Sequence, residues 1–215
     1  MNVLLLGATG RLGSEILKRL IDEKIETTAL VRNPDKLKLN SEHLTVVKGD
    51  VTNSIDLNKA MKSVDVVITA LNISRKSDFP WAKLRTPKTL LSDTMKILVD
   101  LGEKNDIQKI ITISAWGANE SKNDLPMWFK WLINNSNVKY GYEDHERQEN
   151  ILVKSDVDWM IIRPVGLSDS QKNKKANIST DSKTFGLLVA RKTVANFIVT
   201  NLKGNQFVKK IVTIS

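Results

Sequence analysis

Residues 3–13 read VLLLGATGRLG, an apolar run that leads directly into glycines at positions 7, 10 and 13. A short apolar run before glycines is typical of a strand that is buried on both faces. Residues 12–23 then repeat leucine and isoleucine at helical spacing, which predicts a helix with one apolar stripe. A strand, a glycine turn and a helix in this order predict the first unit of a doubly wound α/β fold.

The glycine turn has the composition of a phosphate-binding loop. Its three glycines permit a tight turn, close approach of the backbone to a pyrophosphate, and close packing of the helix, whose amino terminus attracts negative charge. We therefore expect a dinucleotide at this loop; the alternative is a structural turn that binds no ligand. The residues expected to contact the dinucleotide are Gly7, Thr9, Gly10, Arg11, Leu12 and Gly13.

Strand-like and helix-like segments alternate along the rest of the chain, which is typical of a parallel sheet with crossover helices. Pro164 is expected to end the strand before it. We expect one Rossmann-like domain over residues 1–215, with small substrate-side excursions at about 72–87 and 115–135. Further strands are expected at about 27–31, 44–47, 65–70, 109–114, 159–163 and 211–214, and helices at about 53–63, 88–104, 142–153 and 192–202.

The composition narrows the class of protein. The 215 residues, 41% hydrophobic and 27% charged, are ordinary for one large globular domain. The absence of cysteine excludes a disulfide framework and a thiolate nucleophile, and only two histidines argue against a histidine metal site. No basic segment precedes the first apolar run, and no apolar stretch reaches the roughly 18 residues that span a bilayer. We expect a cytoplasmic protein with no metal and no membrane partner.

The chain carries a net charge of +9, which favours anionic ligands in general. Its densest basic stretch holds Lys172, Lys174 and Lys175 among polar residues, without interleaved aromatic side chains that could stack on bases. This stretch predicts a solvated loop and no nucleic-acid partner.

The residue at the end of the second expected strand bears on the choice of cofactor. NAD-binding units usually carry an acid there, which holds the ribose 2′-hydroxyl. This chain has Arg32, whose guanidinium suits the 2′-phosphate of NADP, and Arg11 and Lys36 add positive charge nearby. The sequence therefore favours NADP(H) over NAD(H); the alternative is an Arg32 that only faces solvent.

Three segments together resemble a known family: the opening GATGRLG, Val31-Arg32-Asn33, and Gly49-Asp50-Val51. The likeness is to the atypical short-chain dehydrogenase/reductases, in their NmrA-like and flavin/biliverdin-reductase-B-like branch, and it extends from residue 1 to the final strand. The resemblance implies that further cofactor contacts come from Asp50 and Val51 beside the adenine, from Ala70 and Leu71, and from Pro164 and Val165 near the nicotinamide.

The catalytic Tyr-x-x-x-Lys pair of the usual short-chain reductases is missing. In that pair the lysine lowers the pKa of the tyrosine, so that the tyrosine can donate or accept a proton. Four residues after Tyr140 comes Asp144, and four after Tyr142 comes Glu146. This argues against alcohol–ketone dehydrogenation and against nucleotide-sugar epimerisation. It leaves hydride transfer to an acceptor that needs no proton donor on the enzyme.

Three residues remain as candidates for the active site. Ser114 ends the fifth expected strand, where it can hydrogen-bond the nicotinamide or the substrate, or else cap the strand end. The Asp144-His145 pair resembles the corresponding segment of biliverdin-reductase-B-like enzymes, which implies that His145 lines the substrate side, with Tyr142 bounding the pocket. The alternative is a histidine with a purely structural place in its helix.

Four of the five tryptophans lie in or near the two excursions: Trp81, Trp116, Trp128 and Trp131. Flat rings at that edge predict a stacking platform for a planar acceptor, or else a satellite core or a dimer contact. The leading hypothesis is an NADPH-dependent reductase that passes hydride to a planar, conjugated small molecule such as a flavin or a quinone. The alternatives are an NmrA-like NADP(H) sensor without turnover and a nucleotide-sugar epimerase or dehydratase. A monomer and a homodimer both stay open.

Overall fold

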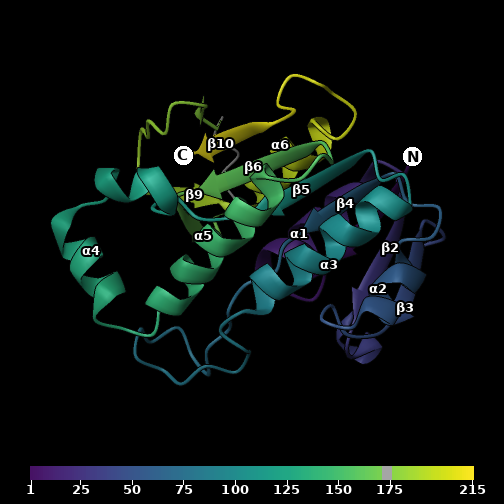
Figure 1. Ribbon diagram of the computed structural model, residues 1–215, viewed down its shortest axis with the longest axis horizontal. Coiled ribbons are helices and arrows are strands. Elements are labelled where there is room, and N and C mark those ends of the chain that lie inside the picture. The colour runs from purple at the N-terminus through teal and green to yellow at the C-terminus, as the bar shows by residue number, and fades with distance from the viewer. Residues whose placement is uncertain (171–175) are drawn as a thin grey trace.

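The computed structural model describes residues 1–170 and 176–215, so the basic stretch with Lys172, Lys174 and Lys175 lies outside the described residues. A central sheet is flanked by helices on both faces (Figure 1). The strands are β1 (Asn2–Leu6), β2 (Glu26–Val31), β3 (Leu44–Lys48), β4 (Val66–Thr69), β5 (Lys109–Ile113), β6 (Trp159–Pro164), β7 (Gly166–Ser168), β8 (Ile178–Ser179), β9 (Leu188–Ala190) and β10 (Lys210–Ile214). The helices are α1 (Arg11–Asp22), α2 (Ser54–Ala60), α3 (Leu90–Lys104), α4 (Met127–Asn134), α5 (Lys139–Val153) and α6 (Arg191–Thr200), with short 3-10 turns η1 (Pro34–Lys36) and η2 (Asn119–Asp124).

The main sheet has the strand order β3-β2-β1-β4-β5-β6-β10-β8. All its pairings are parallel except that of β8, which runs antiparallel to β10 at the edge. A separate parallel pair joins β7 to β9. The order reverses at β1, which lies between β2 and β4, and in open α/β sheets ligands bind at the carboxyl end of such a reversal. The predicted doubly wound Rossmann-like fold is confirmed.

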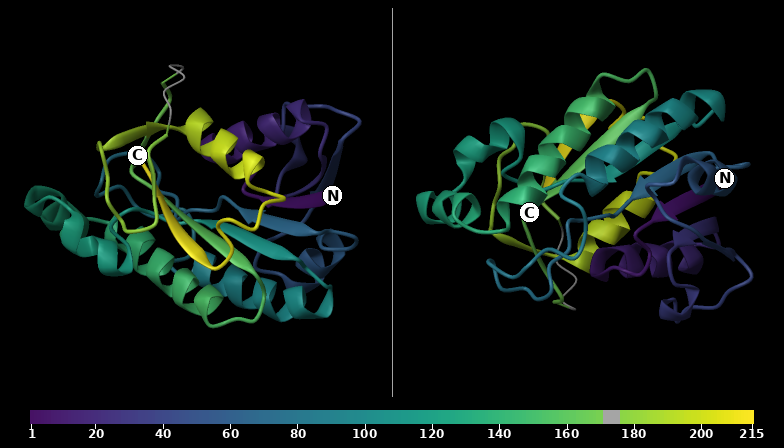
Figure 2. Two further views of the ribbon diagram at one scale, coloured as in Figure 1. Left: turned by 90° about the horizontal axis from the view of Figure 1, so that it is seen from above. Right: turned by 60° about the horizontal axis from the view of Figure 1, so that its bottom comes forward.

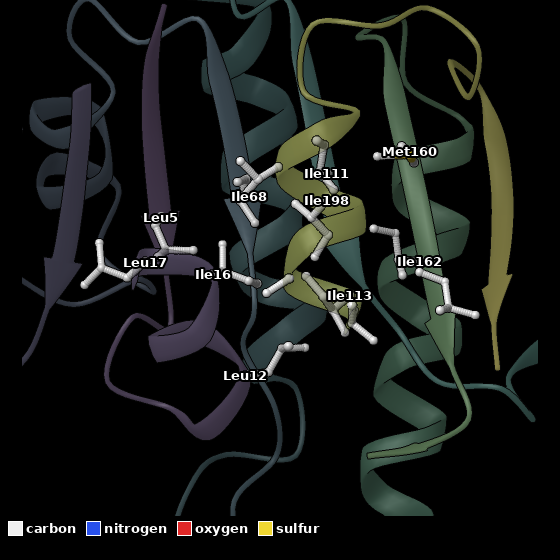
Figure 3. Close-up of a cluster of buried hydrophobic side chains, with 14 of the residues drawn as sticks. Leu5, Leu12, Ile16, Leu17, Ile68, Ile111, Ile113, Met160, Ile162 and Ile198 are labelled. Carbon is white, nitrogen blue, oxygen red and sulfur yellow. The ribbon is translucent and has the colours of Figure 1, made fainter. Parts of the chain in front are cut away.

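Two apolar layers hold the helices to the sheet. Helices α1 and α6 cover one face, and α3 and α5 cover the other (Figure 2). On the first face Leu12, Ile16 and Leu17 of α1 meet buried strand residues such as Ile68 (Figure 3). Each fully buried leucine or isoleucine contributes about 1.5–3 kcal/mol. The core therefore fixes α1, and with it the glycine turn, against the carboxyl end of β1.

Some helices and strands begin or end at residues other than those predicted. Pro164 is the last residue of β6 and pairs in register with Ile214, so the strand continues one residue beyond the expected stop. Pro164 takes part in the pairing through its carbonyl, which accepts from the backbone N–H of Trp116 at 3.0 Å and needs no N–H of its own. Helix α5 begins at Lys139, three residues before the expected start. The short strands β7, β8 and β9 were not expected, because two or three residues carry too little pattern.

The segments 72–87 and 115–135 lie beyond the carboxyl ends of the strands (Figure 1). The first folds back on itself through a bridge between Arg75 and Leu84. The indole Nε1 of Trp81 donates to the carbonyl of Asn135 at 2.7 Å, which ties the first segment to the end of the second. Within the described parts of the chain, no helix is long and apolar enough to cross a membrane.

Candidate functional site

The glycine turn is built so tightly that two of its positions have no room for a side chain. Gly7 has a φ of +86°, and a Cβ placed there would lie 2.6 Å from the carbonyl oxygen of Ala70. A Cβ on Gly13 would lie 2.0 Å from the carbonyl oxygen of Gly7. Gly10 precedes α1 and offers no side chain to cap its first turn. No side chain of the N-cap residue therefore bonds to the first N–H groups of α1, which an anion could meet.

A hollow extends from this turn along the carboxyl ends of β1 to β4. It brings together residues that are far apart in the sequence. Its lining consists of Gly7, Thr9, Leu30, Val31, Arg32, Gly49, Asp50, Val51, Thr52, Leu71, Pro87 and Leu90. Six of the predicted cofactor contacts lie in this set, and the hollow has the glycine turn at one side and an arginine at the other.

Arg32 and Asp50 both line the hollow, directly after β2 and β3. Arg32 is exposed on the rim. The Oδ1 atom of Asp50 accepts from the backbone N–H of Thr52 at 2.9 Å and from its hydroxyl at 2.8 Å. The backbone bond, the hydroxyl bond and the charge of Arg32 lower the pKa of Asp50 against a smaller effect of burial. Asp50 is thus a fixed anion, and Arg32 is the exposed cation beside it.

Ser114 follows β5 at the same edge of the sheet and is only 3% exposed. Its backbone N–H donates to the carbonyl of Ile162 at 2.7 Å. Its Oγ has no hydrogen-bond partner in the described part of the chain. A buried hydroxyl without a partner costs about 1–3 kcal/mol, so a ligand atom that meets it recovers that loss.

His145 lies inside the protein, 5% exposed, on the face of α5 that meets β5. Its Nδ1 is 2.8 Å from the amide Nε2 of Gln148, which also donates to the carbonyl of Ile113 at 3.0 Å. Because an amide nitrogen donates, Nδ1 accepts and the ring proton lies on Nε2. Burial lowers the pKa of His145 to about 4, although the charges of Glu149 and Asp144 oppose this. The imidazole is neutral at pH 7.

Tyr142 lies one turn before His145 on α5. Its hydroxyl donates to the carbonyl of Trp116 at 3.4 Å, and its ring meets Phe129 of α4 edge-on. Burial raises the pKa of Tyr142 to about 12. The hydroxyl therefore stays protonated at neutral pH.

The comparisons with known proteins agree with this geometry. The chain matches the model of a family described as NAD(P)H-binding over residues 7–205. The chain belongs to this NAD(P)H-binding family. The match confirms the predicted class of cofactor and the predicted resemblance to an NAD(P)-binding family.

Two curated relatives match parts of this NAD(P)H-binding chain. It is 26% identical over 219 residues to Protein TIC 62, chloroplastic, of Pisum sativum, which covers 91% of the chain and 39% of that relative. It is 42% identical over 73 residues to the probable pinoresinol-lariciresinol reductase 3 of Arabidopsis thaliana, covering 32% of the chain and 24% of that relative. The chain thus spans about two fifths or less of these relatives.

Among solved structures, ChuY, an anaerobillin reductase from Escherichia coli O157:H7, shares the whole fold. The TM-score is 0.82 with 20% sequence identity, and the match covers 100% of this chain and 96% of that one. This likeness establishes the fold of the NAD(P)H-binding chain.

A buried ionic cluster beside the site was not expected. Arg163 of β6 is wholly buried and donates to both carboxylate oxygens of Glu149 on α5 and to Glu120 of η2. Burial alone would lower the pKa of Arg163, but the bonds to the two carboxylates outweigh it and raise that pKa. The cluster anchors η2, and so the start of the second excursion, to the sheet. The sequence signal for this buried cluster is Glu149, a charged residue on the apolar side of its helix, one turn from Leu152.

Asp144 is a second structural acid in α5. Its carboxylate is fully buried and accepts from the backbone N–H of Leu91 at 2.7 Å and from the hydroxyl of Ser92 at 2.6 Å. It therefore caps the first turn of α3 from another helix. Asp144 fixes α5 against α3, and α5 carries His145 and Tyr142.

The tryptophans do not form one surface. Trp116 is buried in the core with Leu125 and Ile133, and its Nε1 has no partner among the described residues. Trp128 and Trp131 of α4 are exposed. The ring of Trp116 therefore belongs to the same core as α1 and the sheet, and the exposed rings of α4 lie outside that core.

Proposed function

We propose that the chain is an NADPH-dependent reductase that passes hydride to a planar, conjugated acceptor such as a flavin or a quinone. The observation that carries the proposal is the position of Arg32, exposed on the rim of a hollow that begins at the glycine turn. A guanidinium at this point suits the 2′-phosphate of NADPH, which NADH lacks.

The chain's residues fit a dinucleotide. The close backbone contacts at Gly7 and Gly13 hold the turn directly before α1, where a pyrophosphate could approach the first N–H groups of the helix. Asp50 and Val51 would lie beside the adenine, and Ala70, Leu71, Pro164 and Val165 would continue along the nicotinamide half. The unpartnered Oγ of Ser114 supports a hydrogen bond there to the carboxamide or the acceptor.

The bound nicotinamide would supply the hydride. The chain's own contribution would be to orient the two reactants, to exclude water and to hold the charges of the phosphates. The protonation states of Tyr142 and His145 favour an acceptor that needs no proton from the enzyme. Tyr142 keeps its proton far above neutral pH, and His145 carries no extra proton to give. An acceptor that leaves the site as an anion after hydride transfer, and takes its proton from bulk water, suits this site better than a ketone, whose reduction needs a donor.

The activities of similar proteins also support a reductase. One relative is a probable pinoresinol-lariciresinol reductase, and the structural neighbour ChuY is an anaerobillin reductase. We further propose a single cytoplasmic domain whose excursions at 72–87 and 115–135 bound the acceptor. The partners we propose are small molecules, with no nucleic-acid or membrane partner.

The test is the rate of NADPH consumption by the purified protein with FMN, a simple quinone and an azo dye in turn. Reactions without protein and without acceptor are run beside it. Protein-dependent oxidation with at least one acceptor is the expected result. A Ser114→Ala variant should slow that oxidation, with Ser155→Ala, in the turn between α5 and β6, as the matched control. If no acceptor is reduced, the proposal fails.

The second candidate is an NADP(H)-binding sensor without turnover. The protonated Tyr142 and the neutral, buried His145 favour the sensor, because neither side chain offers acid–base chemistry at neutral pH. A sensor would bind NADPH, measured by quenching of tryptophan fluorescence, and would leave every acceptor unreduced. The same pair of measurements thus separates the two candidates.

A further inference from the structure

The glycine turn makes one long-range contact that a phosphate-binding loop does not need. Arg11, the first residue of α1, donates through its two Nη atoms to the two carboxylate oxygens of Asp78, at 3.2 and 3.0 Å. Asp78 lies 67 residues further along the chain, in the 72–87 segment. The side chains are 60% and 83% exposed, so the contact is on the surface.

The form of this contact resembles that of an arginine with a phosphate. Two parallel N–H···O bonds are the arrangement in which a guanidinium also meets phosphate oxygens. Arg11 stands at the amino terminus of α1, where phosphates are attracted by the free N–H groups as well. The two Nη atoms at the end of a guanidinium hold one bidentate anion at a time, and Nε is a separate donor. The carboxylate of Asp78 therefore occupies the Nη pair of Arg11, which a phosphate of the dinucleotide would use in an end-on contact.

The charge of the 72–87 segment makes Asp78 stand out. Asp78 is the only acid in these sixteen residues, against four basic side chains: Arg75, Lys76, Lys83 and Arg85. Without Asp78 the segment would only add positive charge near the phosphates. The single acid is paired with the single arginine of the glycine turn.

The segment is also ordered enough to hold the carboxylate in place. The backbone N–H of Lys76 donates to the carbonyl of Lys83 at 2.9 Å, and the rings of Phe79 and Trp81 lie 5.3 Å apart. Trp81 is in turn bonded to Asn135. Asp78 thus sits on a folded loop between two ties, one to the glycine turn and one to the end of α4.

We propose that Asp78 competes with a phosphate of the dinucleotide for Arg11 and so limits cofactor affinity. Binding transfers the guanidinium from the carboxylate to the phosphate and releases the 72–87 loop from the glycine turn. The proposal rests on cofactor binding at the glycine turn and does not require turnover. Both the pyrophosphate and the 2′-phosphate offer the required chemistry.

The test is the dissociation constant of NADPH and of NADH for Asp78→Asn, by titration calorimetry. An exposed ion pair contributes little, so loss of the competitor should tighten binding by about two- to fivefold. Glu23→Gln is the matched control, because it removes the carboxylate of another exposed arginine pair, Arg19–Glu23, at the far end of the same helix. Tightening with both cofactors assigns the pyrophosphate, and tightening with NADPH alone assigns the 2′-phosphate.

The gain of positive charge in Asp78→Asn could tighten cofactor binding without any competition for Arg11. The same substitution in an Arg11→Gln variant separates these two explanations. In Arg11→Gln the competition no longer exists, so adding Asp78→Asn should leave affinity unchanged within error. An equal gain in both backgrounds would overturn the proposal, as would unchanged or weaker binding by the single variant. If Asp78→Asn tightens NADPH binding but the protein reduces no acceptor, the proposed reductase activity is refuted and the competition is not. Unchanged binding with intact turnover would refute only the competition.

Discussion

Arg163 and Glu149 form a two-point ion pair inside the protein. Nε of Arg163 donates to Oε1 of Glu149 at 2.9 Å, and an Nη donates to Oε2 at 2.6 Å. Both side chains are at most 1% exposed. The pair joins β6 to α5 and continues through Asn119, whose Nδ2 donates to Glu149 at 2.5 Å. The carboxyl edge of the sheet is therefore held by charge as well as by apolar packing.

Removing one member of this pair should be far more costly than removing both. Glu149→Ala leaves a buried guanidinium without its main partner, and we expect the free energy of unfolding to fall by about 3–5 kcal/mol. The double variant Arg163→Met with Glu149→Leu should recover most of that loss, because no buried charge remains. Urea unfolding followed by circular dichroism measures both. A Glu149→Ala loss below about 1 kcal/mol would contradict the account.

His145 should make stability depend on pH. Its folded pKa of about 4 lies below the ordinary value of 6.5, so the unfolded chain binds the proton first as the pH falls. The contribution is therefore fully present above pH 6.5 and is lost progressively down to about pH 4, by about 3 kcal/mol in all. His145→Gln should flatten the stability profile in this window. His43→Gln, which changes the other histidine, is the control and should keep the slope.

Gly13 should tolerate no side chain. A Cβ there would overlap the carbonyl oxygen of Gly7, so Gly13→Ala must push α1 away from the turn. We expect NADPH affinity to fall more than about tenfold and the melting temperature to drop. Gly204→Ala, where a Cβ meets nothing within 4 Å, should change neither. Equal behaviour of the two variants would show that the close approach at Gly13 has no role.

Much of the fold follows from local pattern. The spacing of Leu12, Ile16 and Leu17 predicts α1, and the β-branched runs predict the buried parallel strands, because periodicity reports which face is buried. The three short strands are different. Strand β8 forms through pairing with β10, where Ile178 meets Ile214, and two residues hold no period of their own.

The candidate site likewise has one part that the sequence predicts and one that it does not. The glycine turn and Arg32 are predictable because both lie in one βαβ unit, where position along the chain implies position in space. The pairs Arg163–Glu149 and Arg11–Asp78 join elements far apart in the chain, and charge alone does not identify a partner. The neutral state of His145 depends on burial, and the position of its ring proton depends on Gln148; sequence spacing predicts neither.

The most direct test of the central claim compares NADPH and NADH oxidation, with FMN as acceptor, by the parent protein and by Arg32→Ala. The account predicts a preference for NADPH in the parent. In the variant, kcat/KM for NADPH should fall about tenfold while that for NADH stays unchanged, because only NADPH has the 2′-phosphate. Lys154→Ala, an exposed lysine at the end of α5, serves as the control for general loss of charge. Oxidation without a preference for NADPH, or no protein-dependent oxidation of either cofactor, would contradict it.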